Sequence, residues 1–200
     1  MIPIDLNCLL YHQEVILSKM YDNEKSTYYK NAAERRKEKI MEVFWNENSE
    51  FFFDYDFTQD KNTSTYSLAA LYPLFFNIVD TAIAQKVAVV IEQNFLKAGG
   101  LVTTLYNTGQ QWDYPNGWPP LQWIGYKALK NYGFDTLAND IAERWINLNV
   151  KVFFETNKMM EKYDVIDIHR KGGGGEYELQ DGFGWTNGVF LKLWSELHKE

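Results

Sequence analysis

The sequence has 200 residues, 46% of them hydrophobic and 24% charged, which is the composition of one globular domain. A net charge of −7 argues against a nucleic-acid-binding surface, because contact with phosphates needs clustered lysine and arginine. No apolar run reaches the ~20 residues of a membrane-spanning helix, and residues 1–5 (MIPID) lack the pattern of a signal peptide. We therefore expect a soluble protein that binds neither nucleic acid nor membrane.

Apolar residues recur at helical spacing through most of the chain. Asp80 and Thr81 provide helix caps, Gly99 a helix stop, and Pro119 suits a first helical turn that begins a segment ending at Gly133. The sequence predicts six or seven consecutive helices, and the clearest periodic segments are residues 6–21, 28–44, 82–97, 119–133, 135–158 and 185–197.

The segments between these helices are of two kinds. Aromatic and acidic residues alternate in residues 51–57, which predicts a short extended segment at most. Residues 103–120 and 163–184 are long and irregular, and their aromatic residues argue against disorder. Long ordered loops in a helical protein are usually functional. We expect an α/α architecture without an internal domain boundary, in which ligand-binding groups gather at one end.

Neither a metal nor a cofactor is expected. Cys8 is the only cysteine, so an intrachain disulfide and a cysteine-based metal site are excluded, and the three histidines lie too far apart to indicate zinc. Residues 54–65 resemble a calcium loop only faintly. Gln59 occupies the position that needs glycine, and Thr65 occupies the position that needs glutamate.

The first long loop contains the stretch QQWDYPNGWPP, residues 110–120. It combines two indoles, a carboxylate and amides in a turn fixed by proline. Sugars are bound by such a mixture, because an aromatic face packs against the C–H side of the ring while carboxylates and amides bond the hydroxyls. A buried structural loop is the alternative, and for Trp112 and Trp118 in particular, packing in the core remains open.

The second long loop contains the stretch KGGGGEYELQDGFGW, residues 171–185. Its glycines indicate either a flexible linker or backbone that lies close to a ligand. A dinucleotide-binding loop is excluded, because its third glycine would fall on Tyr177 or Glu178. The acids of the stretch would also repel phosphate. We favour a loop that covers a ligand, with Phe183 and Trp185 anchoring it to the last helix.

Both stretches resemble diagnostic segments of one family. QQWDYPNGWPPLQ and GGGGEYELQDGFGWTNGV are similar to two motifs of the inverting trehalases, glycoside hydrolases of family 37 that form an (α/α)6 barrel. The opening IPIDLNCLLY and the segment MMEKYDV resemble the same family in the same order. The resemblance covers essentially all 200 residues. It implies an all-α fold in which residues 1–200 are one segment, the C-terminal part of an (α/α)6 catalytic domain.

The resemblance also implies a reaction and its residues. It implies hydrolysis of α,α-trehalose to glucose with inversion, which uses one acid and one base on opposite sides of the bond. Glu161 would be the general base, which takes a proton from the attacking water, and Glu176 would contact a substrate hydroxyl. The remaining residues that would line the sugar pocket are Gln111, Trp112, Asp113 and Trp118.

Each of these acids also has a purely structural interpretation. Glu161 follows a predicted helix, and a glutamate at the end of a helix more often faces solvent. Glu176 could be an ordinary loop acid that caps a backbone amide. Gln180 and Asp181 match the family motif, but they could serve only to tie the loop down.

Part of the family's machinery is absent from this sequence. The family's general acid lies in a Gly-Trp-Asp-Phe segment just upstream of the IPIDLN-like start, and that motif does not occur here. None of the four arginines matches the family's substrate-clamping motifs. Asp54 and Asp56 are candidates for a substitute acid, although nothing in the sequence places them near the base. We expect little activity from these 200 residues alone.

The expected ligand is trehalose, and the expected partner is the missing N-terminal portion of the barrel or a second copy of the chain. Six or seven helices cannot close a barrel of twelve, so apolar faces would be exposed. One alternative is a non-catalytic helical module, derived from a trehalase, that binds sugar or mediates assembly. Another is a hydrolase that acts on a different disaccharide. The sequence leaves open a cytoplasmic, periplasmic or secreted location, because any signal would lie upstream.

Overall fold

The structure is a computed structural model that describes residues 1–170 and 176–198. Its helices are α1 (Ile4–Met20), α2 (Glu24–Phe44), the 3-10 helix η1 (Leu68–Leu71), α3 (Tyr72–Phe75), α4 (Thr81–Val90), the π-helical turn η2 (Ile91–Phe95), α5 (Pro119–Asn131), α6 (Asp135–Thr156) and α7 (Gly184–Leu197). Its two-residue strands are β1 (Trp45–Asn46), β2 (Phe51–Phe52), β3 (Tyr55–Asp56), β4 (Lys61–Asn62), β5 (Leu96–Lys97), β6 (Gly100–Leu101), β7 (Asn116–Gly117) and β8 (Tyr163–Asp164).

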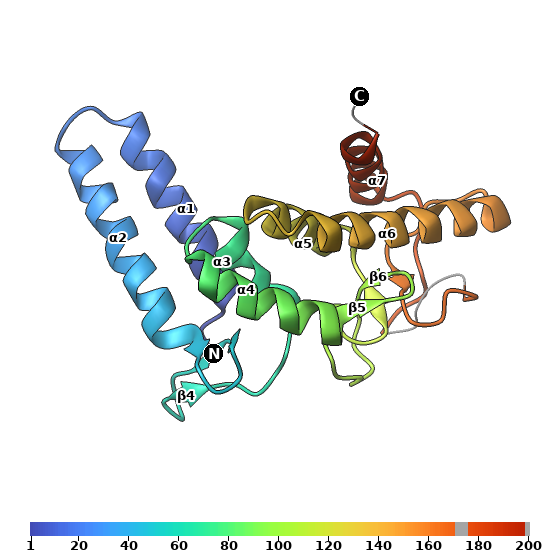
Figure 1. Ribbon diagram of the computed structural model, residues 1–200, viewed down its shortest axis with the longest axis horizontal. Coiled ribbons are helices and arrows are strands. Elements are labelled where there is room, and N and C mark those ends of the chain that lie inside the picture. Colours follow the sequence, from blue (N-terminus) through green and yellow to red (C-terminus); the bar gives the residue numbers. More distant parts are fainter. Residues whose placement is uncertain (171–175, 199–200) are drawn as a thin grey trace.

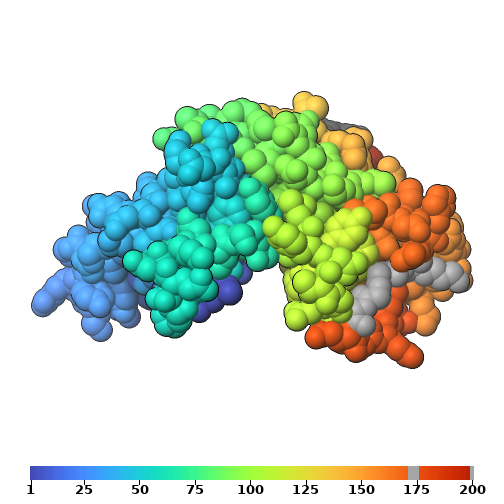
Figure 2. Space-filling view, turned by 90° about the horizontal axis from the view of Figure 1, so that it is seen from below, coloured from blue at the N-terminus to red at the C-terminus, as the bar shows by residue number. Residues whose placement is uncertain are grey.

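The helices follow one another along an arc (Figure 1). Helices α1 and α2 pair as a hairpin at one end, and α6 and α7 lie at the other. Between them α5 packs against α3, α6 and α7. Figure 2 shows the underside as an arch, hollowed between the segment coloured teal, residues 50–65, and that coloured lime, residues 105–118. The second long loop, in orange, adjoins the lime segment.

Three helix boundaries have the local causes that the sequence predicted, at Asp80, Pro119 and Gly133, whereas Gly99 lies between β5 and β6 and does not end a helix. The Asp80 side chain accepts a hydrogen bond from the backbone N–H of Ile83 at 2.9 Å and so caps α4. Helix α5 begins at Pro119, and Gly133 follows it with a φ of 77°. Helix α6 ends where Asn157 takes up a left-handed conformation, with a φ of 57°. No described helix is both long and apolar enough to cross a membrane.

Two helical features differ from the prediction. The helix expected over residues 82–97 is α-helical only to Val90, then widens into η2 and gives way to β5. The change occurs because β5 leaves the helical path to pair with β6, in the register Leu96↔Leu101. The short helices η1 and α3 were not predicted, because an eight-residue apolar run is too short to show helical periodicity.

The core lies under the middle of the arc and extends toward the two long loops. Its largest buried side chains include Trp145 and Tyr126 of the long helices and Tyr163 of β8. Gln122 of α5 fixes the turn between β5 and β6, because its amide bonds both the N–H and the carbonyl of Leu101 at 2.8 and 2.7 Å. Glycine is required at Gly100 in that turn, since its φ is 123° and an added Cβ would lie 2.7 Å from Gln122 Oε1.

The strands form four separate two-stranded ladders, of which one positions the candidate site. Strand β7 lies in the first long loop and β8 in the second, with the antiparallel register Asn116↔Asp164 and Gly117↔Tyr163. At Gly117 an added Cβ would lie 2.4 Å from Val165 Cγ1 and 2.9 Å from the Leu101 carbonyl oxygen. The absence of a side chain there allows the two loops to lie in contact.

Candidate active site

In the structure the second loop begins directly after α6, which ends at Thr156, and its residues 159–164 are held by backbone bonds on two sides. The β7–β8 ladder holds the C-terminal end of this segment. On the other side, the Glu161 N–H donates to the Gln180 carbonyl at 2.9 Å, and the Gly182 N–H donates to the Met159 carbonyl at 2.8 Å. The Thr186 hydroxyl adds a bond to the Met160 carbonyl at 2.6 Å. The backbone on either side of Glu161 is therefore fixed by residues distant in the sequence.

Glu161 is buried, with 5% of its surface exposed, and both of its carboxylate oxygens have partners. Its Oε1 accepts a hydrogen bond from the Tyr177 hydroxyl at 2.9 Å, and its Oε2 lies 3.2 Å from the Lys162 ammonium. Its backbone carbonyl accepts from the Trp185 indole N–H at 3.2 Å. The solvent-facing helical position considered from the sequence does not occur, because α6 ends at Thr156 and Glu161 lies in a buried bend.

Lys162 is fully buried beside Glu161, at 0% exposure. Its ammonium nitrogen lies 5.5 Å from the centre of the Trp118 ring and 4.7 Å from that of the Tyr177 ring. Such distances allow cation–π attraction from both rings. The carboxylate and the ammonium thus form a buried pair of opposite charges within an aromatic enclosure.

Four aromatic rings from the two loops and the start of α7 pack against one another. Trp112 and Trp118 are parallel, with centroids 3.9 Å apart and planes within 3°. Trp185 meets both of them edge-on, and Phe183 stacks on Trp185 at 5.3 Å. Trp118 is 1% exposed, whereas Trp112 is 47% exposed. Trp112 therefore presents an open indole face, and Trp118 supports it from beneath.

The other candidates of the first loop are buried and mainly shape the loop. Asp113 Oδ2 accepts from the Thr108 hydroxyl at 2.7 Å and from the Gln110 N–H at 3.4 Å. The Gln111 carbonyl accepts from the Trp118 indole N–H at 3.0 Å. The Gln111 side-chain amide donates to the Tyr177 carbonyl at 3.4 Å, while its Oε1 is buried and meets no donor among the described residues. A buried acceptor of this kind suits a ligand hydroxyl.

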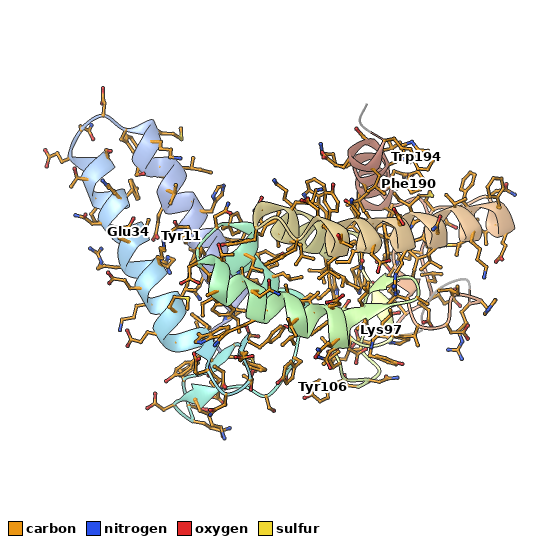
Figure 3. The ribbon with its side chains drawn as sticks, viewed as in Figure 1. Tyr11, Glu34, Lys97, Tyr106, Phe190 and Trp194 are labelled. Carbon is orange, nitrogen blue, oxygen red and sulfur yellow. The ribbon has the colours of Figure 1, made fainter. Side chains whose placement is uncertain are left out.

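The first loop is also tied to the other side of the arch. Tyr106, labelled in Figure 3, donates its hydroxyl proton to the Ser64 carbonyl at 3.0 Å. This bond joins the loop to the segment that follows β4. The hollow of Figure 2 is thus bounded by segments that contact each other.

Glu176 lies at the edge of the described loop and is exposed. Within the part of the chain that the structure describes, its carboxylate has no hydrogen bond or ion pair. The glycines Gly172–Gly175, which were predicted to lie close to a ligand, are outside the described residues. Asp181 pairs with Lys158, and Gln180 contributes its backbone carbonyl to the bond from Glu161. The role of tying the loop down therefore fits both Gln180 and Asp181.

The two candidates for a substitute acid lie in segments across the hollow from the second loop (Figure 2). Asp54 accepts a hydrogen bond from the Ile4 N–H at 2.9 Å, and burial raises the pKa of its carboxyl. Asp56 is bonded by the hydroxyl and the N–H of Thr58, and these bonds lower its pKa. Only Asp54 is thus shifted in the direction that suits a proton donor.

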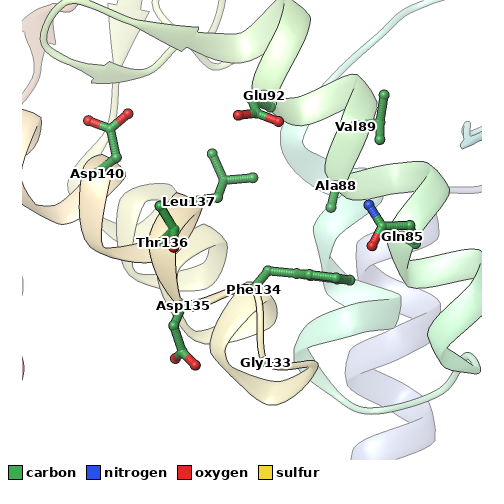
Figure 4. Close-up of a pocket in the computed structure, with 10 residues that line it drawn as sticks. All are labelled: Gln85, Ala88, Val89, Glu92, Gly133, Phe134, Asp135, Thr136, Leu137 and Asp140. Atoms are coloured by element: carbon green, nitrogen blue, oxygen red, sulfur yellow. The ribbon is translucent and has the colours of Figure 1, made fainter.

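One further depression lies apart from these residues, between α4 and the start of α6 (Figure 4). Phe134 and Leu137 form its apolar part. Two of its acids are already paired, Asp135 with Lys130 and Asp140 with Arg144. No described group of three or more His, Cys, Asp or Glu side chains has the geometry of a metal site, here or elsewhere. The depression contains none of the residues predicted to bind substrate.

Sequence reasoning missed two contributors to this site, Lys162 and Tyr177, and expected Trp185 only as an anchor of the loop. Both missed residues lie beside residues that the motifs had marked, and their aromatic or cationic character was the available signal. What the sequence lacks is any indication that these side chains turn inward onto Glu161. That orientation depends on the pairing of β7 with β8.

The family model described as trehalase matches residues 1–198. Periplasmic trehalases of Salmonella paratyphi B and Salmonella enteritidis are 42% identical over 196 residues, which cover 96% of this chain and 34% of theirs. Among solved structures, neutral trehalase Nth1 from Saccharomyces cerevisiae has a TM-score of 0.81 at 30% identity, covering 96% of this chain and 37% of that one.

A second solved structure is similar to this chain in fold alone. The GH63 mannosylglycerate hydrolase from Thermus thermophilus has a TM-score of 0.75 at 20% identity and covers 96% of this chain and 45% of that one. The helices thus form part of an (α/α)6 barrel, in agreement with the all-α fold expected from the sequence. The chain spans about a third of the length of the curated relatives it matches.

Proposed function

We propose that this chain, which belongs to the trehalase family, supplies the general base and part of the sugar pocket for the hydrolysis of α,α-trehalose to glucose with inversion. The observation that carries the proposal is the buried Glu161 carboxylate, held at both oxygens beside an exposed indole face. Because the chain spans only part of the length of its relatives, the remaining machinery is assigned to a segment outside these 200 residues.

Glu161 is proposed to act on water. Its carboxylate would take a proton from the water whose oxygen attacks the anomeric carbon, and a second carboxyl group would protonate the departing glucose. In inverting enzymes the two groups stand about 6.5–9.5 Å apart, which leaves room for the water. The family's acid motif does not occur in this sequence. We therefore propose that the acid comes from the other part of the barrel, with residues 1–200 as its C-terminal part.

The sugar is proposed to rest on the first loop. The open face of Trp112 fits the C–H side of a pyranose ring, and the unpaired Gln111 Oε1 fits a hydroxyl donor. Glu176, which is exposed, would bond a second hydroxyl. Trp118 and Asp113 would contribute from beneath, Trp118 by supporting Trp112 and Asp113 by shaping the loop.

The test is trehalose hydrolysis by this chain, both alone and mixed with the N-terminal two thirds of a related trehalase. We expect little turnover alone and recovery in the mixture, with one of the two glucose products released first as the β-anomer. In the mixture Glu161→Gln should lower kcat about 10²–10⁴-fold. Glu155→Gln, the same change at an exposed position on α6, should leave kcat unaltered. Activity that survives Glu161→Gln would rule out Glu161 as the base.

A second candidate function follows from the absence of the acid motif. A chain that retains the pocket loops without an acid can serve as a helical sugar-binding or assembly module. Calorimetric titration with trehalose distinguishes the two, since binding without turnover in any mixture favours the module. Hydrolysis of another disaccharide in preference to trehalose would point instead to a different substrate.

We propose that the exposed apolar surface of α6 and α7 meets the partner. Phe154 is 80% exposed and Leu191 65%, beside a groove between the two helices. Figure 3 shows Phe190 and Trp194 near each other on α7, where their rings stack with centroids 6.2 Å apart. Sedimentation of the chain, alone and with the N-terminal portion, distinguishes self-association from assembly with that portion.

A further inference from the structure

We propose that Lys162 is the positioning residue of the base, which fixes the orientation of the Glu161 carboxylate from within the molecule. The inference rests on the proposed function, because it assigns Lys162 to the same site. Lys162 is fully buried, and a buried ammonium group is costly unless an opposite charge and further contacts compensate for it.

The compensation comes from three groups that all belong to the site. The Glu161 carboxylate lies 3.2 Å from the Lys162 nitrogen. The same nitrogen lies 5.5 Å from the centre of the Trp118 ring and 4.7 Å from that of the Tyr177 ring. The backbone bends at Glu161 and Lys162, so that neighbouring side chains, which point to opposite faces of a straight strand, converge. The Lys162 side chain thus points toward the carboxylate and not toward solvent.

A purely structural role explains this arrangement poorly. An apolar side chain of similar length would fill the same space without desolvating a charge, and such replacements of buried ion pairs are often neutral or stabilising. The two contacts of the carboxylate also differ in character. Tyr177 is 41% exposed and donates from a loop at the surface, whereas Lys162 is buried on the inner side. Lys162 is therefore the partner that solvent does not replace.

The expected effect on catalysis concerns the placement of the base. A general base must stand within hydrogen-bond reach of the proton that it takes, and the Lys162 ammonium holds Oε2 of the carboxylate from the buried side. The Tyr177 hydroxyl donates to Oε1 from the surface loop. Without Lys162 the carboxylate would keep the contact from the surface and lose the buried one.

The first test measures kcat and KM for trehalose hydrolysis in the mixture described above, with Lys162→Met and Lys162→Arg. For Lys162→Met we expect kcat to fall by about tenfold or more while KM changes little, because the carboxylate loses the contact that fixes it. Lys162→Arg, which keeps a charged donor beside the carboxylate, should recover part of kcat. Lys127→Met removes an exposed lysine of α5 and should leave kcat unchanged. A folded Lys162→Met protein with an unaltered kcat overturns the proposal.

The second test needs no activity, so it separates this inference from the proposed function. The urea midpoint is measured for the 200-residue chain with Lys162→Met, with Glu161→Gln and with both. We expect Lys162→Met to lower the midpoint when Glu161 is present and to change it little when residue 161 is glutamine. Equal shifts in both backgrounds overturn the proposal. If Lys162→Met alone does not fold, a folded double variant supports the coupling, and an unfolded one shows that Lys162 is only structural.

Discussion

The α1–α2 hairpin and the two long loops show that regular secondary structure and burial are separate properties. The hairpin contains 17 and 21 helical residues, yet buries only Ile4 and Cys8 from α1 and Ala33, Ile40 and Phe44 from α2. The described part of the second loop has one two-residue strand, yet residues 160–165 are six consecutive buried residues. The irregular segment is the one that positions the candidate base.

The two regions are held by different kinds of contact. In the hairpin, Arg36 reaches across to Glu14 through two hydrogen bonds, at 2.8 and 2.9 Å, near the surface. In the loops, several bonds join residues distant in sequence, such as Trp185 to Glu161 and Gln111 to Tyr177. A substitution in the hairpin should therefore act locally, whereas one in the loops should release several contacts at once.

The largest expected effect is that of Trp118→Ala. Trp118 is 1% exposed between Trp112 and Trp185, so its removal should leave a cavity and lower the free energy of unfolding by about 3–5 kcal/mol. Tyr28→Ala, which truncates a 64% exposed ring in the hairpin, should change it by less than about 0.5 kcal/mol. Urea unfolding measures both, and equal effects would contradict the distinction between the two regions.

The next effect concerns alkaline pH. Burial raises the pKa of Tyr163 in β8 from 10.0 to about 12. Its neutral form is favoured in the folded state, so the associated stability is fully present below pH 10 and is lost as the pH rises toward 12. The loss should be roughly 2 kcal/mol.

Tyr163→Phe should remove the contribution of Tyr163 to the decrease of unfolding free energy with pH. It also removes the hydrogen bond that the Tyr163 hydroxyl accepts from the Met160 N–H. Tyr132, at the end of α5, also has a pKa raised by burial to about 12. Tyr132→Phe is therefore a matched control, because it removes a tyrosine with the same pKa shift outside the loops. Chemical unfolding between pH 9 and pH 12 measures the slope. If Tyr163→Phe leaves the slope unchanged, the buried loop is not its source.

The smallest effect is expected in the hairpin, from Arg36→Met. The pair with Glu14 is partly exposed, with 29% and 16% of the two side chains accessible, so its loss should cost about 0.2–1 kcal/mol. The cost should shrink in high salt, because mobile ions screen such pairs. Lys39→Met removes the 65% exposed partner of Glu42 and should cost less. A loss as large as that of Trp118→Ala would show that the hairpin is as tightly coupled as the loops.

The contrast also explains what the sequence could predict. Helices α5 and α6 follow from apolar periodicity, from Pro119 at one start and from Gly133 between them, all of which are local signals. Glu161 was marked by its resemblance to a motif, and its burial agrees with a role in a site. The sequence could not show that Trp112 is the exposed indole and Trp118 the buried one. The two residues lie in the same loop, and their exposure depends on which of them packs beneath the other.

The burial of Lys162 could not be predicted from the sequence either. A lysine beside a glutamate usually indicates a solvated pair, and only the bonds of this segment to β7 and to Gln180 turn both side chains inward. The turn η2 had no signal either, since the helical pattern of residues 82–97 continues through it. Long-range pairing, and not local propensity, decides these features.

The aromatic stack makes the two loops observable by optical spectroscopy. Parallel indoles 3.9 Å apart couple their electronic transitions, so Trp112 and Trp118 should give an exciton signal in circular dichroism that vanishes when the first loop detaches. Phe183 at the end of the second loop and Trp185 at the start of α7 pack beside these indoles, and their docking should alter the same signal. The molecule thus contains an intrinsic reporter of loop assembly, and measurements of it require no label.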